Sequence, residues 1–419
     1  WMCIAMMETV DELVDDIHAG LLVWYDFIPG DEVLYFGRQE DSLAAALKDK
    51  HVQLTCADYS IMQDVVWQRE NIGRFSYIVS VTDLEMEREP TAALAAWRQL
   101  LQQDGKLLLA MNNRLGIRYF CGDRDPYTQR NFDGIENYRR VYAKPEDRFY
   151  GRMYSQGELR RMLEEAGWRY IQFFSVLPDL QHAALIYAED YLPQEDIGGR
   201  VFPKYNYPDT VFLEENGLYQ TLVDEGLFHK LANAYFIECS LTGKLSDVNH
   251  VTCSMERGRQ DALLTMIRKS AVVDKLAVFP EGRDRLRELL QNGVALAAQG
   301  INVVPAKLQQ DVYRMPYIQA EIGHVYLRRL LLSDQDCFLA AMDHFRDLIF
   351  QSSEKADEDA DRGLILKCGY LDMVPLNSFF IEGEFVFFDQ EFCLSDYPAN
   401  AILWRAIETL YGDSVELRK

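Results

Sequence analysis

The sequence predicts an α/β protein in which a doubly wound parallel sheet precedes a smaller α+β domain. Over residues 31–115, short apolar runs alternate with helical stretches, which is typical of a parallel sheet covered by helices on both faces. Parts of the second half carry apolar runs in close succession, which favours antiparallel pairing. A chain of 419 residues also exceeds what one ordinary core accommodates. We therefore expect two domains.

Composition narrows the class of protein further. Hydrophobic residues make up 48% of the chain and aromatic residues 12%, as in folded globular proteins. The formal net charge of −23 argues against nucleic-acid binding, which depends on clustered Lys and Arg. No apolar run reaches the length of a membrane span, so we expect no integral membrane segment. The eight Cys show no CxxC spacing, which disfavours a zinc site and suits a reducing cytoplasm.

The elements of the first half end in residues typical of a nucleotide-type site. A Gly ends the first strand at Gly37, and an acid, Asp58, follows the second strand. Glycine permits close backbone approach, and a carboxylate can bind ribose hydroxyls. Asp83 and Glu85 follow the third strand and either contact the ligand or cap the next helix. We expect strands at 32–37, 51–57, 75–81 and 105–111, with helices at 42–48 and 91–103.

Loop residues after the fourth strand allow two interpretations. Arg114, Arg118 and Arg124 lie near the aromatic pair Tyr119 and Phe120. They either grip an anionic or sugar acceptor or belong to a solvated loop.

A segment rich in Gly and Pro separates the halves. Residues 196–209 include Gly198 and Gly199, with three prolines in or beside them, which is typical of a linker. The predicted organisation is a first domain at 1–200, a linker at 201–215 and a second domain at 216–419. The second domain is divided into a small lobe at about 216–318 and a short large lobe at 319–419.

The second domain begins with a predicted antiparallel sheet followed by a helix. Lys275, in a Val-Asp-Lys sequence, is the candidate for binding phosphate, with Glu288 of the helix as its partner. Arg268 and Lys269 compete for the role of Lys275. The acidic run 354–361 is expected to be a solvated loop. We expect strands at 234–240, 249–254, 262–268 and 272–278, and helices at 281–291 and 334–351.

Three residues near the end of the chain carry the most informative chemistry. Asp372 is followed by Asn377 and then by Asp389, and two strands at 378–381 and 384–388 form a predicted hairpin between them. Phosphoryl transfer uses one carboxylate to orient the acceptor hydroxyl, and an amide oxygen with a second carboxylate to hold Mg²⁺. The alternative is a surface hairpin with incidental acids.

With these motifs in place, residues of about 20–200 resemble class I S-adenosylmethionine-dependent methyltransferases of the kind found beside bacterial surface-polysaccharide glycosyltransferases. The resemblance rests on the Gly37 turn, Asp58, the Asp83-Leu84-Glu85 sequence and the later segment 154–168. It implies a Rossmann-like fold with S-adenosylmethionine bound by Gly37, Asp58, Asp83 and Glu85. The first motif reads Gly37-Arg38-Gln39-Glu40-Asp41 in place of G-x-G-x-G. The alternative is a fold that has lost the cofactor and kept a structural role.

Residues 216–419 resemble the aminoglycoside-phosphotransferase-like branch of the protein-kinase fold. The resemblance implies ATP and Mg²⁺ as cofactors, Asp372 as catalytic base, and Asn377 and Asp389 as metal ligands. It also implies that Lys275 contacts the phosphates and pairs with Glu288. No Gly-rich G-x-G-x-x-G loop precedes Lys275, and the metal motif reads Asp-Gln-Glu at 389–391 in place of D-F-G.

Together the halves resemble bifunctional enzymes that end bacterial polysaccharide chains by phosphorylating and methylating the terminal sugar. That resemblance implies a glycan or other small hydroxyl acceptor, with glycosyltransferases as partners. One alternative is a methyltransferase whose C-terminal half only binds acceptor or partner. Another is a non-enzymatic scaffold with both sites degenerate.

Overall fold

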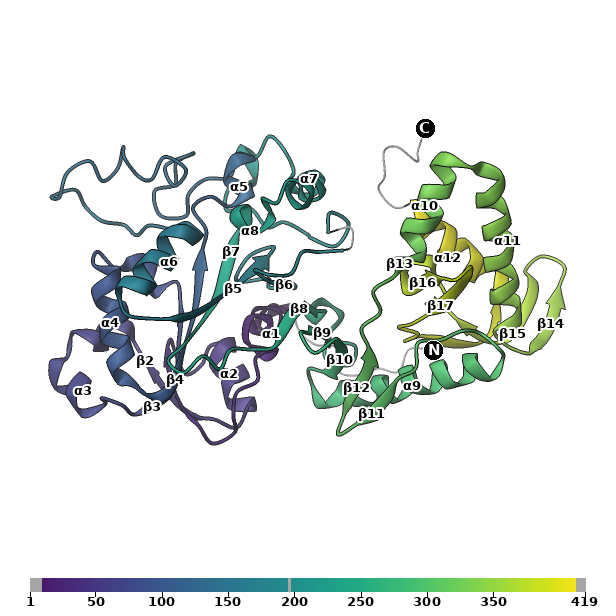
Figure 1. Ribbon diagram of the computed structural model, residues 1–419, viewed down its shortest axis with the longest axis horizontal. Helices are drawn as coiled ribbons and strands as arrows, with labels where there is room; N and C mark the ends of the chain where they lie inside the picture. The colour runs from purple at the N-terminus through teal and green to yellow at the C-terminus, as the bar shows by residue number, and fades with distance from the viewer. Residues whose placement is uncertain (1–9, 195–196, 412–419) are drawn as a thin grey trace. The chain divides into compact units, whose positions relative to one another are not determined.

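The computed structural model describes residues 10–194 and 197–411, and these divide after Gly258 into two compact units (Figure 1). The doubly wound parallel sheet predicted for the first half is confirmed. Its strands follow the order β8–β6–β5–β7–β4–β3–β1–β2. Their bounds are Glu32–Phe36 (β1), Gln53–Ala57 (β2), Phe75–Val81 (β3), Leu101–Asn112 (β4), Tyr170–Leu177 (β5), Leu185–Ala188 (β6), Ala234–Ser240 (β7) and Val248–Cys253 (β8).

Strand polarity determines which loops meet at one edge of this sheet. β1 pairs in parallel with β2 and with β3, and β3 pairs in parallel with β4. β7 runs antiparallel to both of its neighbours, β4 and β5. β4 and β5 therefore point the same way, and the carboxyl ends of β1 to β5 lie along one edge. Because β2 and β3 flank β1 on opposite sides, the topological switch point, where α/β sheets bind ligands, lies between β1 and β3.

Side chains that alternate along β5 and β7 supply two cores, one on each face of the sheet. Phe173 and Tyr235 belong to the cluster that contains Trp97 and Trp168. Their neighbours Phe174 and Phe236 point the other way and meet the ring of Trp24, with centroids 5.2 and 5.1 Å apart. This alternation is the period-two pattern of a strand buried on both faces.

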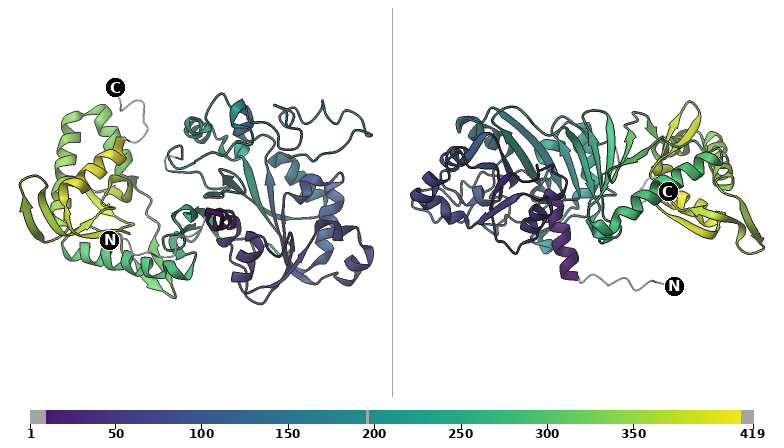
Figure 2. Two further views of the ribbon diagram at one scale, coloured as in Figure 1. Left: turned by 180° about the vertical axis from the view of Figure 1, so that it is seen from behind. Right: turned by 90° about the horizontal axis from the view of Figure 1, so that it is seen from below.

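Helices cover both faces of the first sheet. α1 and α2 lie on one face, and α4 and α6 lie on the other, as the views from the front and from behind both show (Figures 1 and 2). Local sequence fixes two of the helix starts: Asp41 accepts the Ala44 amide at the start of α2, and Ser155 and Glu158 form a capping box on α6. The helices are Val10–Val23 (α1), Ser42–Asp49 (α2), Val65–Glu70 (α3), Pro90–Leu100 (α4), Ile117–Phe120 (α5), Gln156–Glu165 (α6), Tyr219–Asp224 (α7) and Phe228–Leu231 (α8).

The predicted domain boundary is wrong. The strands expected at 234–240 and 249–254 in the second domain are β7 and β8, which pair with β4, β5 and β6 of the first sheet. The first unit continues to Gly258. An apolar sequence predicts a strand but not the strand with which it pairs, and β7 pairs with strands that lie far before it in the chain.

The segment 201–215 is not a linker. Its backbone is bound to the first unit, because the amides of Asn206 and Tyr207 donate to the carboxylate of Asp123 at 3.0 and 2.8 Å. Val201 and Glu215 are buried. Its Gly- and Pro-rich composition is typical of a linker, but the segment is an irregular part of the first unit.

The second unit combines small sheets with four longer helices among its described residues. β11, β12, β10 and β9 are antiparallel neighbours, and two three-stranded sheets follow the orders β13–β16–β17 and β14–β15–β18. The predicted hairpin is confirmed as β16 and β17. The bounds are Leu263–Arg268 (β9), Val272–Ala277 (β10), Arg283–Ala298 (α9), Lys307–Gln309 (β11), Val312–Pro316 (β12), Glu321–Ile322 (β13), Gly323–Ser333 (α10), Gln335–Gln351 (α11), Lys355–Asp359 (β14), Gly363–Tyr370 (β15), Ser378–Ile381 (β16), Glu384–Phe387 (β17), Cys393–Pro398 (β18) and Ala399–Tyr411 (α12).

The acidic run predicted as a loop at 354–361 contains a strand. β14 pairs with β15, and the two form a hairpin that protrudes beside α11 (Figures 1 and 2). Lys355 bonds Glu358 and Lys367 bonds Glu354 within this hairpin. These pairs bring opposite charges together on an exposed strand whose composition alone favours a loop.

The corrected boundary makes a direct prediction about fragments. A fragment ending at Gly258 keeps β7 between β4 and β5, and we expect it to unfold in one cooperative thermal transition. A fragment ending at residue 215 loses β7 and exposes the backbone groups of both neighbours, so it is expected to aggregate or to show no cooperative transition. Circular dichroism with size-exclusion chromatography distinguishes the two. A residue-215 fragment as stable as the longer one would contradict the boundary.

Candidate functional site

The predicted cofactor residues of the first unit lie at the carboxyl edge of the sheet, where the switch point is. Gly37 follows β1, Asp58 follows β2 and Asp83 follows β3. Since these three strands are parallel neighbours, the structure brings the ends that carry these residues to one edge. What each residue does there differs.

The space beside Gly37 is filled by a tyrosine. A Cβ at residue 37 would lie 2.3 Å from ring atoms of Tyr35, so no other residue fits without displacing that ring. The Tyr35 hydroxyl donates to Asp41 at 3.0 Å, and Asp41 also accepts the Arg38 amide at 3.1 Å. The glycine that the sequence suggests for cofactor approach therefore accommodates Tyr35 on that side.

The two carboxylate oxygens of Asp58 differ in their hydrogen bonds. Its Oδ1 accepts from the amide and the hydroxyl of Ser60, and these hydrogen bonds lower the pKa of Asp58 below its ordinary value. Oδ2 has no hydrogen-bond partner in the part of the chain that the structure describes. An exposed, ionised carboxylate with a free oxygen can accept hydrogen bonds from vicinal hydroxyls.

Asp83 and Glu85 occupy different environments. Asp83 is half-buried beside the Ser80 hydroxyl at 2.8 Å, and burial raises the pKa of Asp83 to about 6. Glu85 is fully buried and accepts from the Asn112 amide and the Tyr127 hydroxyl, both at 2.6 Å. Burial raises the pKa of Glu85 to about 8, although these hydrogen bonds lower it. Glu85 thus joins the ends of β3 and β4 to the following loop.

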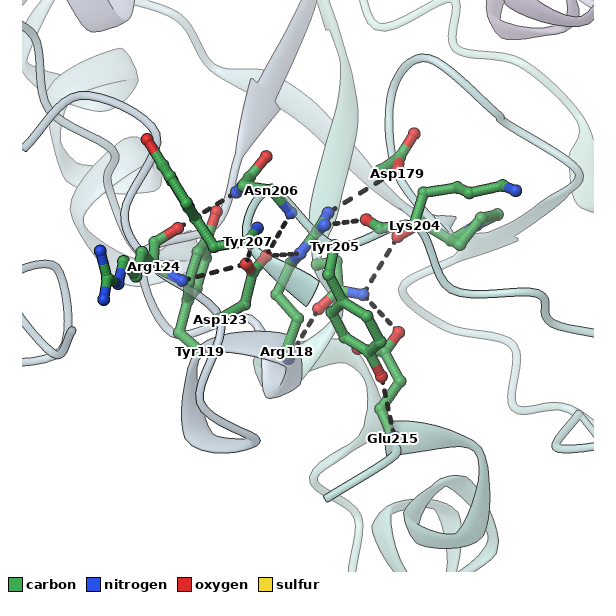
Figure 3. Close-up of polar contacts among 12 residues, drawn as sticks. Arg118, Tyr119, Asp123, Arg124, Asp179, Lys204, Tyr205, Asn206, Tyr207 and Glu215 are labelled. Carbon is green, nitrogen blue, oxygen red and sulfur yellow. Dashed lines mark hydrogen bonds and ion pairs between the residues drawn. The ribbon is translucent and has the colours of Figure 1, made fainter. Parts of the chain in front are cut away.

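A buried polar network lies beside this edge, around Arg118 of α5 (Figure 3). The Arg118 guanidinium donates to Asp123 at 2.9 Å and to the Lys204 carbonyl, and it lies 3.7 Å from Asp179. Its side chain is only 7% exposed. The interpretation of Arg118 as part of a solvated loop is wrong, because its side chain is buried and bonds Asp123 and the Lys204 carbonyl. Its contact with an anionic or sugar acceptor stays a prediction.

The second unit brings the three predicted phosphoryl-transfer residues together. The Nζ of Lys275 on β10 bonds both Asp389 and Glu391, the latter at 3.1 Å. Asp372 lies beside them, because its Oδ2 accepts the amides of Glu391 and Phe392 at 3.0 and 2.9 Å. The Asp372 carbonyl in turn accepts the Asn377 side chain at 3.3 Å.

The charges of this cluster are strongly coupled. Burial alone would lower the pKa of Lys275, but the carboxylates of Asp389 and Glu391 hold it above its ordinary value. Burial raises the pKa of Asp389 to about 6, although Lys275 acts in the opposite direction. Burial also raises the pKa of Asp372. Two carboxylates around one buried ammonium leave a net negative site suited to a cation or a metal-bound nucleotide.

Glu288 is not the partner of Lys275. Its side chain is 54% exposed and bonds Arg285 at 2.7 Å. The reason is the orientation of α9, which buries Leu286 and Leu289 and turns Glu288 to solvent. Glu391, and not the predicted Glu288, is the glutamate that pairs with Lys275. The sequence does indicate this contact, because Glu391 lies two residues after Asp389 in the triplet Asp-Gln-Glu.

No helix within 10–194 or 197–411 is long and apolar enough to cross a membrane. Across the same residues, no group of three or more His, Cys, Asp or Glu side chains is arranged to hold a metal ion. Metal binding at Asn377 and Asp389 would need oxygen ligands from a bound nucleotide in addition.

The chain has weak structural similarity to known proteins. No family model and no curated protein matches the chain. Among solved structures, methyltransferases from Thermotoga maritima (12% identity, TM-score 0.27) and Archaeoglobus fulgidus (9%, 0.30) each match over 54% of this chain and 92% of theirs. A Haemonchus contortus phosphoethanolamine N-methyltransferase with S-adenosylhomocysteine bound (10%, 0.27) matches over 54% of this chain and 51% of its own.

The buried Glu85 predicts how stability depends on pH. Its folded-state pKa lies near 8 against an ordinary value of 4.5, so between these values the folded protein keeps a proton that the unfolded chain has released. The free energy of unfolding should therefore fall as pH rises through this window, by at least about 1.4 kcal/mol, the equivalent of one pKa unit.

Glu85→Gln removes the titrating group and should flatten this part of the profile. Denaturant unfolding between pH 5 and 8 measures the effect, with the exposed Glu165→Gln as control. Parallel profiles for wild type and Glu85→Gln would contradict the assignment.

Proposed function

We propose that the first unit is an S-adenosylmethionine-dependent methyltransferase that binds its cofactor at the carboxyl edge of the sheet. The observation that carries the proposal is the meeting of Gly37, Asp58 and Asp83 at a switch point between parallel strands. Ligands of open α/β sheets bind at such points. The sequence resemblance to class I methyltransferases supports the choice of cofactor.

The groups at this edge fit a nucleoside with a cationic sulfur. Asp58 offers a free carboxylate oxygen to ribose hydroxyls, and Asp41 and Asp83 add acidic side chains that favour a positive charge nearby. S-adenosylmethionine supplies an electrophilic methyl group. The protein would bind its nucleoside, orient it beside the acceptor and exclude water. Tyr35 confines the cofactor to the side of Gly37 that its ring leaves open.

The acceptor belongs to the proposal as well. The sequence resemblance supports a glycan or another small hydroxyl compound of bacterial surface-polysaccharide synthesis, modified in the cytoplasm beside glycosyltransferases. The −23 net charge also suits a neutral acceptor better than a polyanion.

Asp58→Asn tests the cofactor site. Loss of the charge should weaken S-adenosylmethionine binding more than tenfold, about 1.4 kcal/mol or more, because charge-assisted hydrogen bonds are stronger than neutral ones. Isothermal titration measures the change. Asp64→Asn is the matched control, since Asp64 caps α3 through its side chain just as Asp58 caps its own turn. If the unmutated protein does not bind S-adenosylmethionine at millimolar concentration, the proposal is wrong and the alternative remains, a fold that has lost the cofactor and kept a structural role.

A second candidate function is phosphoryl transfer by the second unit. It is favoured by one observation, the contact of buried Lys275 with Asp389 and Glu391 beside Asp372. Nucleotide phosphates would contact Lys275, and Mg²⁺ would be held by Asp389 together with the side-chain oxygen of Asn377. The other oxygen of Asp372, 3.5 Å from Arg405, would then orient an acceptor hydroxyl.

Variants at Asp389 and Asp372 should separate binding from transfer. Asp389→Ala removes a charged ligand and should abolish Mg²⁺-dependent ATP binding. Asp372→Asn keeps an oxygen for the amides of Glu391 and Phe392, so it should bind Mg·ATP within about twofold of wild type and lose transfer by about 100-fold or more. Titration calorimetry and release of labelled phosphate measure the two steps. Equal loss of ATP binding in both variants would contradict the separate roles.

A further inference from the structure

We propose that His182, oriented by Asp179, is the general base of the first unit and takes the proton of a hydroxyl acceptor. The inference rests on the proposed methyltransferase function and assigns it a residue outside the cofactor motifs. His182 lies in the loop between β5 and β6. Because β5 points the same way as β4, this loop belongs to the same carboxyl edge as Gly37 and Asp58.

The pair has the geometry of an oriented imidazole. Nδ1 of His182 lies 2.9 Å from Oδ1 of Asp179, which also accepts the amides of Gln181 and His182 at 2.9 Å each. A carboxylate on Nδ1 fixes the tautomer and leaves Nε2 as the proton acceptor. Nε2 of His182 has no partner among residues 10–194 and 197–411. The imidazole is 32% exposed, so a ligand can reach it.

Asp179 also contacts the buried network around Arg118. Asp179 is 13% exposed, and its Oδ2 lies 3.7 Å from the Arg118 guanidinium (Figure 3). Burial alone would raise the pKa of Asp179, but hydrogen bonds and charges from His182 and Arg118 keep it below its ordinary value. Asp179 is therefore ionised at neutral pH and acts as a positioning residue.

Helix α1 lies against both this loop and the start of α2, which follows the cofactor motif. His18 on α1 bonds the hydroxyl of Ser42, the first residue of α2 after Asp41, at 2.8 Å. At Gly20 on the same helix, a Cβ would lie 3.0 Å from the Ala183 carbonyl, so α1 touches the His182 loop directly. α1 thus bridges the start of α2 and the loop that carries the proposed base.

The proposed step balances without another reactant. The acceptor hydroxyl gives its proton to Nε2 of His182 while its oxygen forms a bond to the methyl carbon. The methyl–sulfur bond breaks, and its electron pair stays on sulfur. The products are a methyl ether and S-adenosylhomocysteine, and the imidazolium releases its proton to water.

Two measurements that need no acceptor test where His182 lies and which of its ring nitrogens carries the proton. Diethylpyrocarbonate should modify His182, and saturating S-adenosylhomocysteine should slow that reaction at least fivefold, as read by peptide mass spectrometry. The exposed His51, which precedes β2 at the opposite edge, should react at the same rate with and without ligand. In ¹⁵N-histidine spectra, His182 should be protonated on Nδ1 in the wild type and shift toward Nε2 protonation in Asp179→Ala, which removes the oxygen that accepts from Nδ1. His182→Gln assigns the signal.

A kinetic measurement tests the chemistry, with methyl glycosides of glucose, galactose and mannose as hydroxyl probes. His182→Gln should lower kcat for methyl transfer about 100-fold and leave S-adenosylhomocysteine affinity unchanged, whereas His51→Gln should change neither. Ligand binding without protection of His182, or equal kcat in His182→Gln and wild type, would overturn the assignment. Methylation of none of the probes despite cofactor binding would overturn the hydroxyl acceptor. Failure to bind S-adenosylhomocysteine would instead overturn the proposed function, and this inference with it.

Discussion

The antiparallel pairing of β7 with both β4 and β5 is the constraint on which the first unit depends. Residues 234–240 pair with β4 from Lys106 to Asn112 and with β5 from Tyr170 to Val176. A strand antiparallel to both neighbours makes those neighbours parallel to each other. The end of β5, with the Asp179–His182 pair, therefore lies on the same edge as the ends of β1 to β4. Had β5 run the other way, the proposed base would lie at the opposite edge from Asp58.

The second unit depends on a comparable constraint, the clamping of residues 389–392. Asp372 holds this segment through the amides of Glu391 and Phe392, and Asn292 of α9 donates to the Gln390 carbonyl at 2.9 Å. The clamp fixes both acids around Lys275. A buried ammonium between two carboxylates is costly to desolvate, and its direct pairing offsets that cost. We infer that nucleotide binding would exchange one of these carboxylate contacts for phosphate.

The sequence predicted best what is local. The strands at β1, β2 and β3 and the β16–β17 hairpin follow from apolar runs with clear ends, and Asp58 and Asp389 stand at the strand ends where they were expected. Long-range pairing was not predictable in this way. The run at 234–240 reads as a strand in any sheet, and only packing of Phe236 against Trp24 and Tyr235 in the opposite core assigns it to the first unit.

Side-chain partners were also missed where two acids compete. Glu288 and Glu391 were both available to Lys275, and the burial of Leu286 and Leu289 decided between them by turning Glu288 outward. The loop 201–215 was misjudged because composition does not reveal that Asp123 binds its amides. The Asp179–His182 pair lies only three residues apart, but its importance comes from strand polarity, which the sequence does not show.

The central claim, that ligand binds at the carboxyl edge of the first sheet, is tested most directly by hydrogen–deuterium exchange with S-adenosylhomocysteine. The account predicts slower amide exchange in the segments at 37–41, 58–63 and 179–184, which come from three different strand ends and from no contiguous stretch of sequence. The amino edge, including the turn at 49–52 before β2, should be unchanged. Protection confined to the amino edge, or no protection at saturating ligand, would contradict it.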